Sequence, residues 1–169
     1  MSHTTQRRKA MRYAIALLAC SSAVLAGPIL SATSYGAIRF GERVETVEKR
    51  LHERVPQPID TEEAHCRLFE FKAYPQMIFM IEDGVITRAG TSSSIPTSIG
   101  VTVGLSMKTI RRRFPGVKIE PHTYDPTGHY LTLKTESQKA AIVMEESGGR
   151  ITEIRGGLIP SVTYVEGCL

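Results

Sequence analysis

The sequence is poor in the signals that mark a catalytic centre. Its 169 residues include no tryptophan and only three cysteines, and they contain no CxxC or Cys/His metal-binding pattern. Neither a glycine-rich phosphate-binding loop nor a dinucleotide-binding fingerprint is present. Ser92–Ser94 lack the strand–turn–helix context of a nucleophile elbow. We therefore expect no cofactor and no catalytic residues, and we expect the protein not to be an enzyme.

Acidic residues are missing before Glu42, and this gap explains the formal charge of +4. Residues 1–32 hold four basic residues, Arg7, Arg8, Lys9 and Arg12. The remainder keeps 17 of the 21 basic residues, against 17 acidic ones. A neutral body gives no electrostatic reason to expect nucleic-acid binding. We expect the basic run 111–113 to be the solvated face of a helix.

Residues 1–32 are typical of an export signal. The basic stretch TQRRKAMR precedes the run YAIALLACSSAVLAGPILSA, which is apolar and rich in small residues. Cleavage is expected after Ala26 or Ala32. Two alternatives stay open: lipidation of Cys20, which follows a lipobox-like Leu-Leu-Ala, and retention of residues 13–32 as a membrane anchor. The expected location is periplasmic or secreted, with membrane attachment through this segment alone if it is retained.

Export changes how the other two cysteines are interpreted. Cys66 and Cys168 form an even pair, and exported proteins fold in oxidising compartments. We predict a disulfide between them, which would tie the start of the strand region to the end of the chain. The alternative is that both are free, buried thiols.

An internal repeat is the clearest organisational signal. AIRFGERVETVEKRL (37–51) aligns with GVTVGLSMKTIRRRF (100–114), which places Gly41 on Gly104. DGVITRAG (83–90) aligns with GGRITEIR (148–155), which places Gly84 on Gly149. Two segments that match at nearly the same offset predict a tandem duplication.

The repeat divides the chain into four parts. Residues 1–32 are the export signal or anchor, and residues 33–90 are the first repeat. Residues 91–98, rich in serine and threonine, read as a linker. Residues 99–169 are the second repeat, which ends in the predicted disulfide tail.

Each repeat begins with a helical pattern. Apolar residues recur at i, i+3 and i+7, first at Val44, Val47 and Leu51 and then at Met107, Ile110 and Phe114. This spacing predicts one amphipathic helix per repeat. Ser106 is the expected N-cap of the second helix, and Pro115-Gly116 ends it.

Strand-forming runs follow each helix. We predict strands at 66–72, 76–82, 85–89, 117–124, 129–134, 140–145 and 150–155, with Asp83-Gly84 as a two-residue hairpin turn. The predicted fold class is therefore α+β: tandem duplicated units of one helix plus an antiparallel β-meander, with the helices packed on one sheet face. The other sheet face would stay exposed, an arrangement that suits binding.

The duplicated motif apolar-x-apolar-Gly-x-x-apolar-x-x-apolar, followed by a meander over residues 36–156, resembles the tandem-repeat fold of β-lactamase inhibitor protein. It is also similar to the single unit of the small outer-membrane lipoprotein of the β-barrel assembly machinery. Those units have two helices, whereas each repeat here shows one. The C-terminal SVTYVEGCL is similar to the ends of uncharacterised exported bacterial proteins. The resemblance implies a binding protein, either an inhibitor of an envelope enzyme or an assembly adaptor.

The segment EPHTYDPTGHY (120–130) concentrates polar chemistry. If Asp125-Pro126-Thr127-Gly128 is a four-residue turn, Tyr124 pairs with His129 and His122 with Leu131, and all four share one sheet face. A plain polar hairpin explains this composition. A second interpretation is a metal site formed by His122, Asp125 and His129.

We therefore expect an exported, non-enzymatic protein-binding module, inhibitor-like or adaptor-like, whose partner is another exported or envelope protein. The residues expected at the contact are Tyr74, His122, Tyr124, His129 and Tyr130. The alternative is a metal-binding protein or small metal-dependent enzyme that uses the histidine hairpin.

Overall fold

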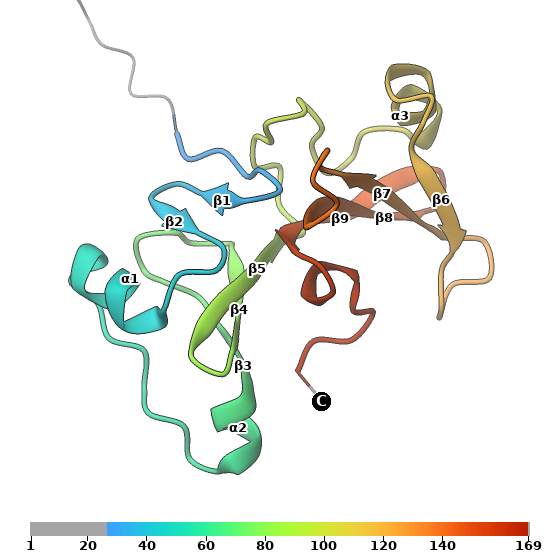
Figure 1. Cartoon of the computed structure of the whole chain (residues 1–169). Helices are drawn as coiled ribbons and strands as arrows, with labels where there is room; N and C mark the ends of the chain where they lie inside the picture. The colour runs from blue at the N-terminus through green and yellow to red at the C-terminus, as the bar shows by residue number, and fades with distance from the viewer. Residues whose placement is uncertain (1–26, 169) are drawn as a thin grey trace, which may run out of the picture.

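The computed structural model describes residues 27–168 (Figure 1). The predicted signal up to residue 26, with the lipidation candidate Cys20, lies outside the described residues. Within the described range, no helix is long and apolar enough to cross a membrane.

One antiparallel sheet of seven strands dominates the molecule. The strands are β3 (Cys66–Phe69), β4 (Ile78–Glu82), β5 (Val85–Thr91), β6 (Lys118–Pro121), β7 (His129–Lys134), β8 (Ala140–Ser147) and β9 (Arg150–Leu158). Their order across the sheet is β3-β4-β5-β9-β8-β7-β6. Each of the seven predicted strand ranges overlaps one of these strands. A separate two-stranded sheet, β1 (Ser34–Tyr35) with β2 (Ile38–Arg39), was not predicted.

The predicted fold class is wrong in its helical layer. The helices are α1 (Val44–Leu51), α2 (Thr61–His65) and α3 (Met107–Arg113), followed by the short 3₁₀ helix η1 (Ser161–Thr163). At 1.5 Å per residue, α1 and α3 are about 12 Å and about 10 Å long, whereas seven strands span about 29 Å. Such short helices cannot cover the sheet. Figure 1 shows α1 and α3 at opposite ends of the molecule, so the protein is mostly β.

Both helices begin in the same way, bonded to a hairpin. The backbone of α1 and the residues before it bonds to the β4–β5 hairpin: Gly41 N–H to Ile86 O (2.7 Å) and Val44 N–H to Gly84 O (2.9 Å). For α3 and the β8–β9 hairpin, the bonds run from Gly104 N–H to Ile151 O (2.8 Å) and from Met107 N–H to Gly149 O (2.9 Å). In the sequence alignment, the donors and acceptors of the two bonds near α1 correspond to the donors and acceptors of the two bonds near α3.

Local sequence explains the helix starts and the first hairpin. Ser106 caps α3 as predicted, because its side chain accepts the Thr109 N–H. Asp83 and Gly84 have φ angles of 47° and 75°, the left-handed conformation that a two-residue type I′ turn requires. Both features were predicted correctly.

The hydrophobic core lies on one sheet face and spans both halves. Strand residues such as Phe79, Ile86 and Met144 belong there to one buried cluster with Val47 of α1 and Ile110 of α3. The rest of the cover is not helical. The β1–β2 hairpin and the connecting segments supply Leu30, Tyr35, Ile38, Phe71, Met77 and Val101.

The folded part begins before residue 33. The side chain of Leu30 is fully buried, its N–H donates to Pro96 O (3.0 Å), and its carbonyl accepts the Ser98 N–H (2.8 Å). The boundary predicted at residue 32 therefore lies inside the fold. Of the two expected cleavage positions, Ala26 leaves this contact intact and Ala32 removes it.

We expect Leu30→Ala to lower the free energy of unfolding by about 2–5 kcal/mol, because it leaves a cavity in a fully buried site. Ile29→Ala is the matched control: the neighbouring side chain is 46% exposed, so its removal should change stability by less than about 0.5 kcal/mol. Urea denaturation measures both. Equal effects of the two substitutions would show that Leu30 is not part of the core.

Candidate functional site

Two arginines occupy the other sheet face, where the two halves meet. Arg88 on β5 lies opposite Gly157 on β9, and Arg155 on β9 lies opposite Gly90 on β5. A Cβ atom at Gly157 would come within 2.4 Å of Arg88 Cβ, and one at Gly90 within 2.9 Å of Arg155 Cγ. Each glycine thus leaves the space that the opposite arginine needs. The pattern Arg-x-Gly occurs once on each strand.

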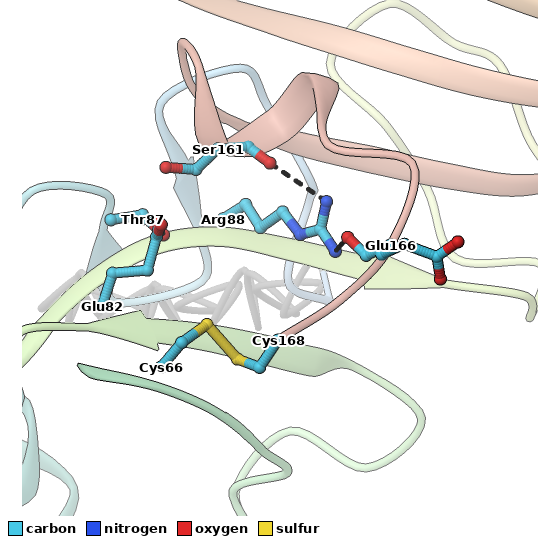
Figure 2. Close-up of a disulfide and its surroundings, with 7 residues drawn as sticks. All are labelled: Cys66, Glu82, Thr87, Arg88, Ser161, Glu166 and Cys168. Carbon is cyan, nitrogen blue, oxygen red and sulfur yellow. Dashed lines mark hydrogen bonds between the residues drawn. A yellow bond between two sulfur atoms is a disulfide. The ribbon is translucent and has the colours of Figure 1, made fainter. Parts of the chain in front are cut away.

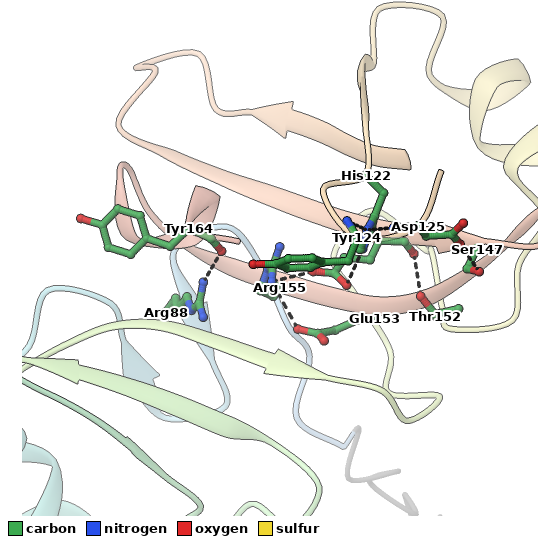
Figure 3. Close-up of polar contacts among 10 residues, drawn as sticks. Arg88, His122, Tyr124, Asp125, Ser147, Thr152, Glu153, Arg155 and Tyr164 are labelled. Atoms are coloured by element: carbon green, nitrogen blue, oxygen red, sulfur yellow. Dashed lines mark hydrogen bonds and ion pairs between the residues drawn. The ribbon is translucent and has the colours of Figure 1, made fainter. Parts of the chain in front are cut away.

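Arg88 is almost completely buried, and backbone carbonyls satisfy its charge. Its Nη1 donates to Ser161 O (3.0 Å) and its Nη2 to Glu166 O (3.3 Å) (Figure 2), and Nη1 also donates to Tyr164 O (3.0 Å) (Figure 3). Burial, and next the neighbouring Arg155, lower the pKa of Arg88. A guanidinium still stays protonated. Arg88 therefore anchors the C-terminal segment over the sheet.

A disulfide fixes the end of this segment. Cys66 and Cys168 are joined, as predicted, with Cα atoms 5.3 Å apart, although the two residues are 102 positions apart in the sequence (Figure 2). Val162 packs on Ala141 and Val143 of β8 in a small second cluster. The bridge indicates an oxidising, exported environment.

Arg155 organises a cluster of charges beside Arg88. Its Nη1 lies 2.7 Å from Glu145 Oε1 and 3.7 Å from Glu153 Oε1 (Figure 3). The two glutamates face each other across β8 and β9. Burial raises the pKa of Glu153; Arg155 opposes that shift, and the charge of Glu145 adds to it. Arg155 Nε is buried and has no hydrogen-bond acceptor within the described part of the chain.

The segment after β6 forms one wall of the site. His122 Nδ1 accepts the N–H groups of Tyr124 and Asp125 (3.1 Å each), so the ring proton sits on Nε2, 3.5 Å from Glu145 Oε2. The imidazole stacks on Tyr130 with 4.4 Å between ring centroids. These contacts leave the Tyr124 ring 67% exposed, projecting beside Arg155 (Figure 3).

Asp125 fastens the same segment at its other end. Its carboxylate accepts the Ser147 hydroxyl (2.6 Å), the Thr127 N–H (2.9 Å) and the Thr127 hydroxyl (2.9 Å). These hydrogen bonds, led by the one from Ser147, lower the pKa of Asp125 from 3.8 to about 2. Asp125 therefore supports the loop and the β8–β9 turn together.

A cavity of about 660 Å³ lies between these elements. The cluster of Arg88, Arg155, Glu145 and Glu153 lines it on one side, with both arginines buried and both glutamates partly exposed. A second cavity of about 470 Å³ shares Arg155 and Val165 with it. Of the seven large hydrophobic side chains exposed among residues 27–168, four line the larger cavity: Leu68, Ile78, Tyr124 and Val165.

The predicted pairing of the histidine segment is wrong. His129 pairs with Pro121 rather than with Tyr124, so β6 ends before His122. His122 contacts Tyr130 and Glu145 on the cavity face, whereas His129 alternates onto the core face, where its Nδ1 lies 2.7 Å from Glu146 Oε2.

The predicted metal ligands are therefore not brought together. His122 and His129 lie on opposite sheet faces, and Asp125 is occupied by hydroxyl and N–H donors. Within residues 27–168, no group of three His, Cys, Asp or Glu side chains is placed to hold a metal ion.

Of the five residues expected at a partner contact, only Tyr124 is open at the cavity. His122 and Tyr130 lie behind it, stacked and largely buried. Tyr74 packs on the core, and its hydroxyl accepts the Ala37 N–H (2.8 Å). His129 faces away.

Arg88, Arg155 and Glu153 were not among the residues predicted from the sequence. A signal for the arginines was available within the aligned repeats: each lies in a strand-forming run and is followed by glycine two positions later. Only the β5–β9 pairing shows that the two patterns meet.

Comparisons with protein-family models, with curated proteins and with solved structures gave no match to this chain. The family resemblance seen in the sequence stays a prediction, and the function has to be inferred from the geometry of the cavity.

Reduction of the disulfide should destabilise the protein. Closing a loop of this length contributes about 4–5 kcal/mol in the chain-entropy model, so a reductant should lower the free energy of unfolding by up to that amount. Denaturation with and without reductant measures it. The double variant Cys66→Ser/Cys168→Ser is the control, and a reductant effect that persists there would mean that the bridge is not its origin.

Asp125 should stabilise the fold over a defined pH range. Because its pKa is lowered in the folded state, its contribution is complete above the unfolded value of 3.8 and is lost as pH falls toward about 2. We expect Asp125→Asn to lower the Tm at pH 7, with a difference that shrinks below pH 4. Exposed Glu136→Gln is the control. A difference that stays constant down to pH 2 would contradict the assignment.

Proposed function

We propose that this protein is an exported binding protein, periplasmic or secreted, that docks another exported protein at the cavity beside the C-terminal segment. The observation that carries the proposal is the concentration of exposed apolar side chains around this one cavity. Exposed apolar groups that gather on one surface, bordered by polar residues, are typical of interaction sites. Scattered single residues would need no such explanation.

The composition of the surface supports a protein partner. Interface cores are enriched in tyrosine and arginine, and here an exposed Tyr124 stands over the buried Arg155. Leu68 and Val165 add apolar area from β3 and from the C-terminal segment. These groups lie on separate parts of the chain, so only the folded protein presents them together.

The rigidity of the surroundings also supports docking. The disulfide and the Arg88 hydrogen bonds hold the C-terminal wall, and the Asp125 and His122 contacts hold the opposite wall. Walls that are fixed before binding lose little conformational entropy when a partner binds. The inhibitor-like or adaptor-like role implied by the sequence resemblance fits such a preformed surface.

The test is capture of a stoichiometric partner from envelope extract by the oxidised, exported protein, followed by affinity measurement with purified components. We expect Tyr124→Ala to weaken binding about 30-fold, the effect of losing an interface hot spot of about 2 kcal/mol. Ile29→Ala removes an exposed apolar group that does not line the cavity, and binding should be unchanged.

The proposal fails if Tyr124→Ala leaves the affinity unchanged while the variant is folded, because the contact would then lie elsewhere. It also fails if the oxidised protein retains no stoichiometric protein at low and moderate salt.

A further inference from the structure

The cavity has acidic groups whose binding capacity is not used. Glu153 has no hydrogen bond to any described residue; its one ion-pair contact is Arg155 Nη1 at 3.7 Å, and its side chain is 33% exposed. Glu145, in contrast, is paired with Arg155 at 2.7 Å and faces His122. The carboxylate of Glu166 likewise lacks a hydrogen bond or ion pair within residues 27–168, and this residue also lines the cavity.

The charges around the cavity do not balance. Two arginines, Arg88 and Arg155, stand against three glutamates, Glu145, Glu153 and Glu166. The charge of Arg88 is already matched by three carbonyl oxygens. A positively charged group entering the cavity would therefore find an excess of carboxylate, whereas an anion would be repelled.

The remaining lining suits a long basic side chain. The exposed ring of Tyr124 can contact a cation through its face. Leu68, Ile78 and Val165 offer apolar surface to the methylene stem of lysine or arginine, whose charged end then reaches the polar part of the cavity.

A second, independent observation points to a peptide ligand. The Arg155 side chain is only 5% exposed, borders the cavity, and keeps its Nε–H without an acceptor among the described residues. A buried donor without an acceptor is rare and costs free energy. A backbone carbonyl of a bound peptide segment would supply the missing acceptor once the Arg155 side chain turns its buried Nε–H toward the cavity, whereas an ammonium group has no acceptor to offer.

From these contacts we infer that the cavity receives a lysine or arginine side chain of the partner protein, with Glu153 as its counter-ion. This inference rests on the proposed docking function and names the chemistry of the segment that docks. The partner should present that side chain on an exposed, extended stretch, since the cavity lies between the C-terminal segment and the loop after β6.

The experiment uses capped tripeptide probes, acetyl-Ala-Lys-Ala-amide and its Arg, Gln and Glu counterparts, titrated into the ¹⁵N-labelled oxidised protein at low salt. We expect the Lys and Arg probes to shift the backbone amides of residues 88–93 and 153–155 in a saturable manner. The Gln and Glu probes should bind at least fivefold more weakly. Glu153→Gln, which keeps the shape and removes the charge, should weaken the Lys probe at least fivefold.

Exposed Glu136→Gln is the matched control and should leave probe binding unchanged. Burial raises the pKa of Glu153, so removing its charge should not unfold the protein; an unchanged Tm for Glu153→Gln checks this. Equal binding of the Lys and Gln probes, stronger binding of the Glu probe, or no effect of Glu153→Gln would each overturn the inference. Saturable binding of a disaccharide probe at these amides, without binding of the Lys probe, would also overturn it.

The captured partner separates this inference from the docking proposal. If Tyr124→Ala weakens partner binding and Glu153→Gln does not, docking stands and the basic side chain is excluded. If neither substitution has an effect, both proposals fall.

Discussion

The pairing of β5 with β9 is the interaction on which the rest of the structure depends. It joins two meanders into one seven-stranded sheet, and it sets two arginines side by side on the face away from the core. Such a pair of like charges would be costly if it stood alone. Three carbonyl oxygens from the C-terminal segment accept hydrogen bonds from Arg88, and two glutamates form ion pairs with Arg155. The C-terminal segment therefore helps to stabilise the two like charges that the β5–β9 pairing places at the centre of the sheet.

The same arrangement leaves a cavity on this face of the sheet. Because Arg88 holds the C-terminal segment and Asp125 holds the loop after β6, the two walls are fixed at their bases, and the charged floor between them stays open. Exposed side chains from both walls then border the opening. Neighbouring members of one charge cluster thus differ: the guanidinium of Arg88 is hydrogen-bonded within the fold, whereas Glu153 has no hydrogen bond to a described residue.

Sequence reasoning succeeded where local physics decides the outcome. The Asp83-Gly84 turn, the Ser106 cap, the positions of the strands and the cysteine pair all follow from backbone preferences or from counting, and the structure contains each of them. The prediction of a helical layer was wrong because the spacing of apolar residues gives the face of a helix but not its length. Helices of about two turns cannot cover seven strands. The two-stranded sheet β1–β2 was not predicted because strands of two residues are too short to show an alternating pattern of apolar residues.

The site itself was harder to predict for a different reason. The His122 and Asp125 side chains bond to nearby backbone N–H groups, and such bonds compete with the ladder that a simple turn would form. The strand pairing therefore differs from the predicted one, and the two histidines lie on opposite faces of the sheet. Arg88 and Arg155 gave no reason on their own to be placed inside, since charged residues in strands are usually solvated. Their burial depends on contacts between segments that lie far apart in the sequence.

The C-terminal wall also has a consequence for biogenesis. Strands β3 to β5 are made first, but the cavity stays incomplete until Cys168 has left the ribosome, crossed the membrane and met Cys66 in an oxidising compartment. A nascent chain would lack this wall, and a reduced chain would hold it through the Arg88 hydrogen bonds and the packing of Val162 without the bridge. The cavity therefore takes its full form only after the C-terminal segment has joined the sheet.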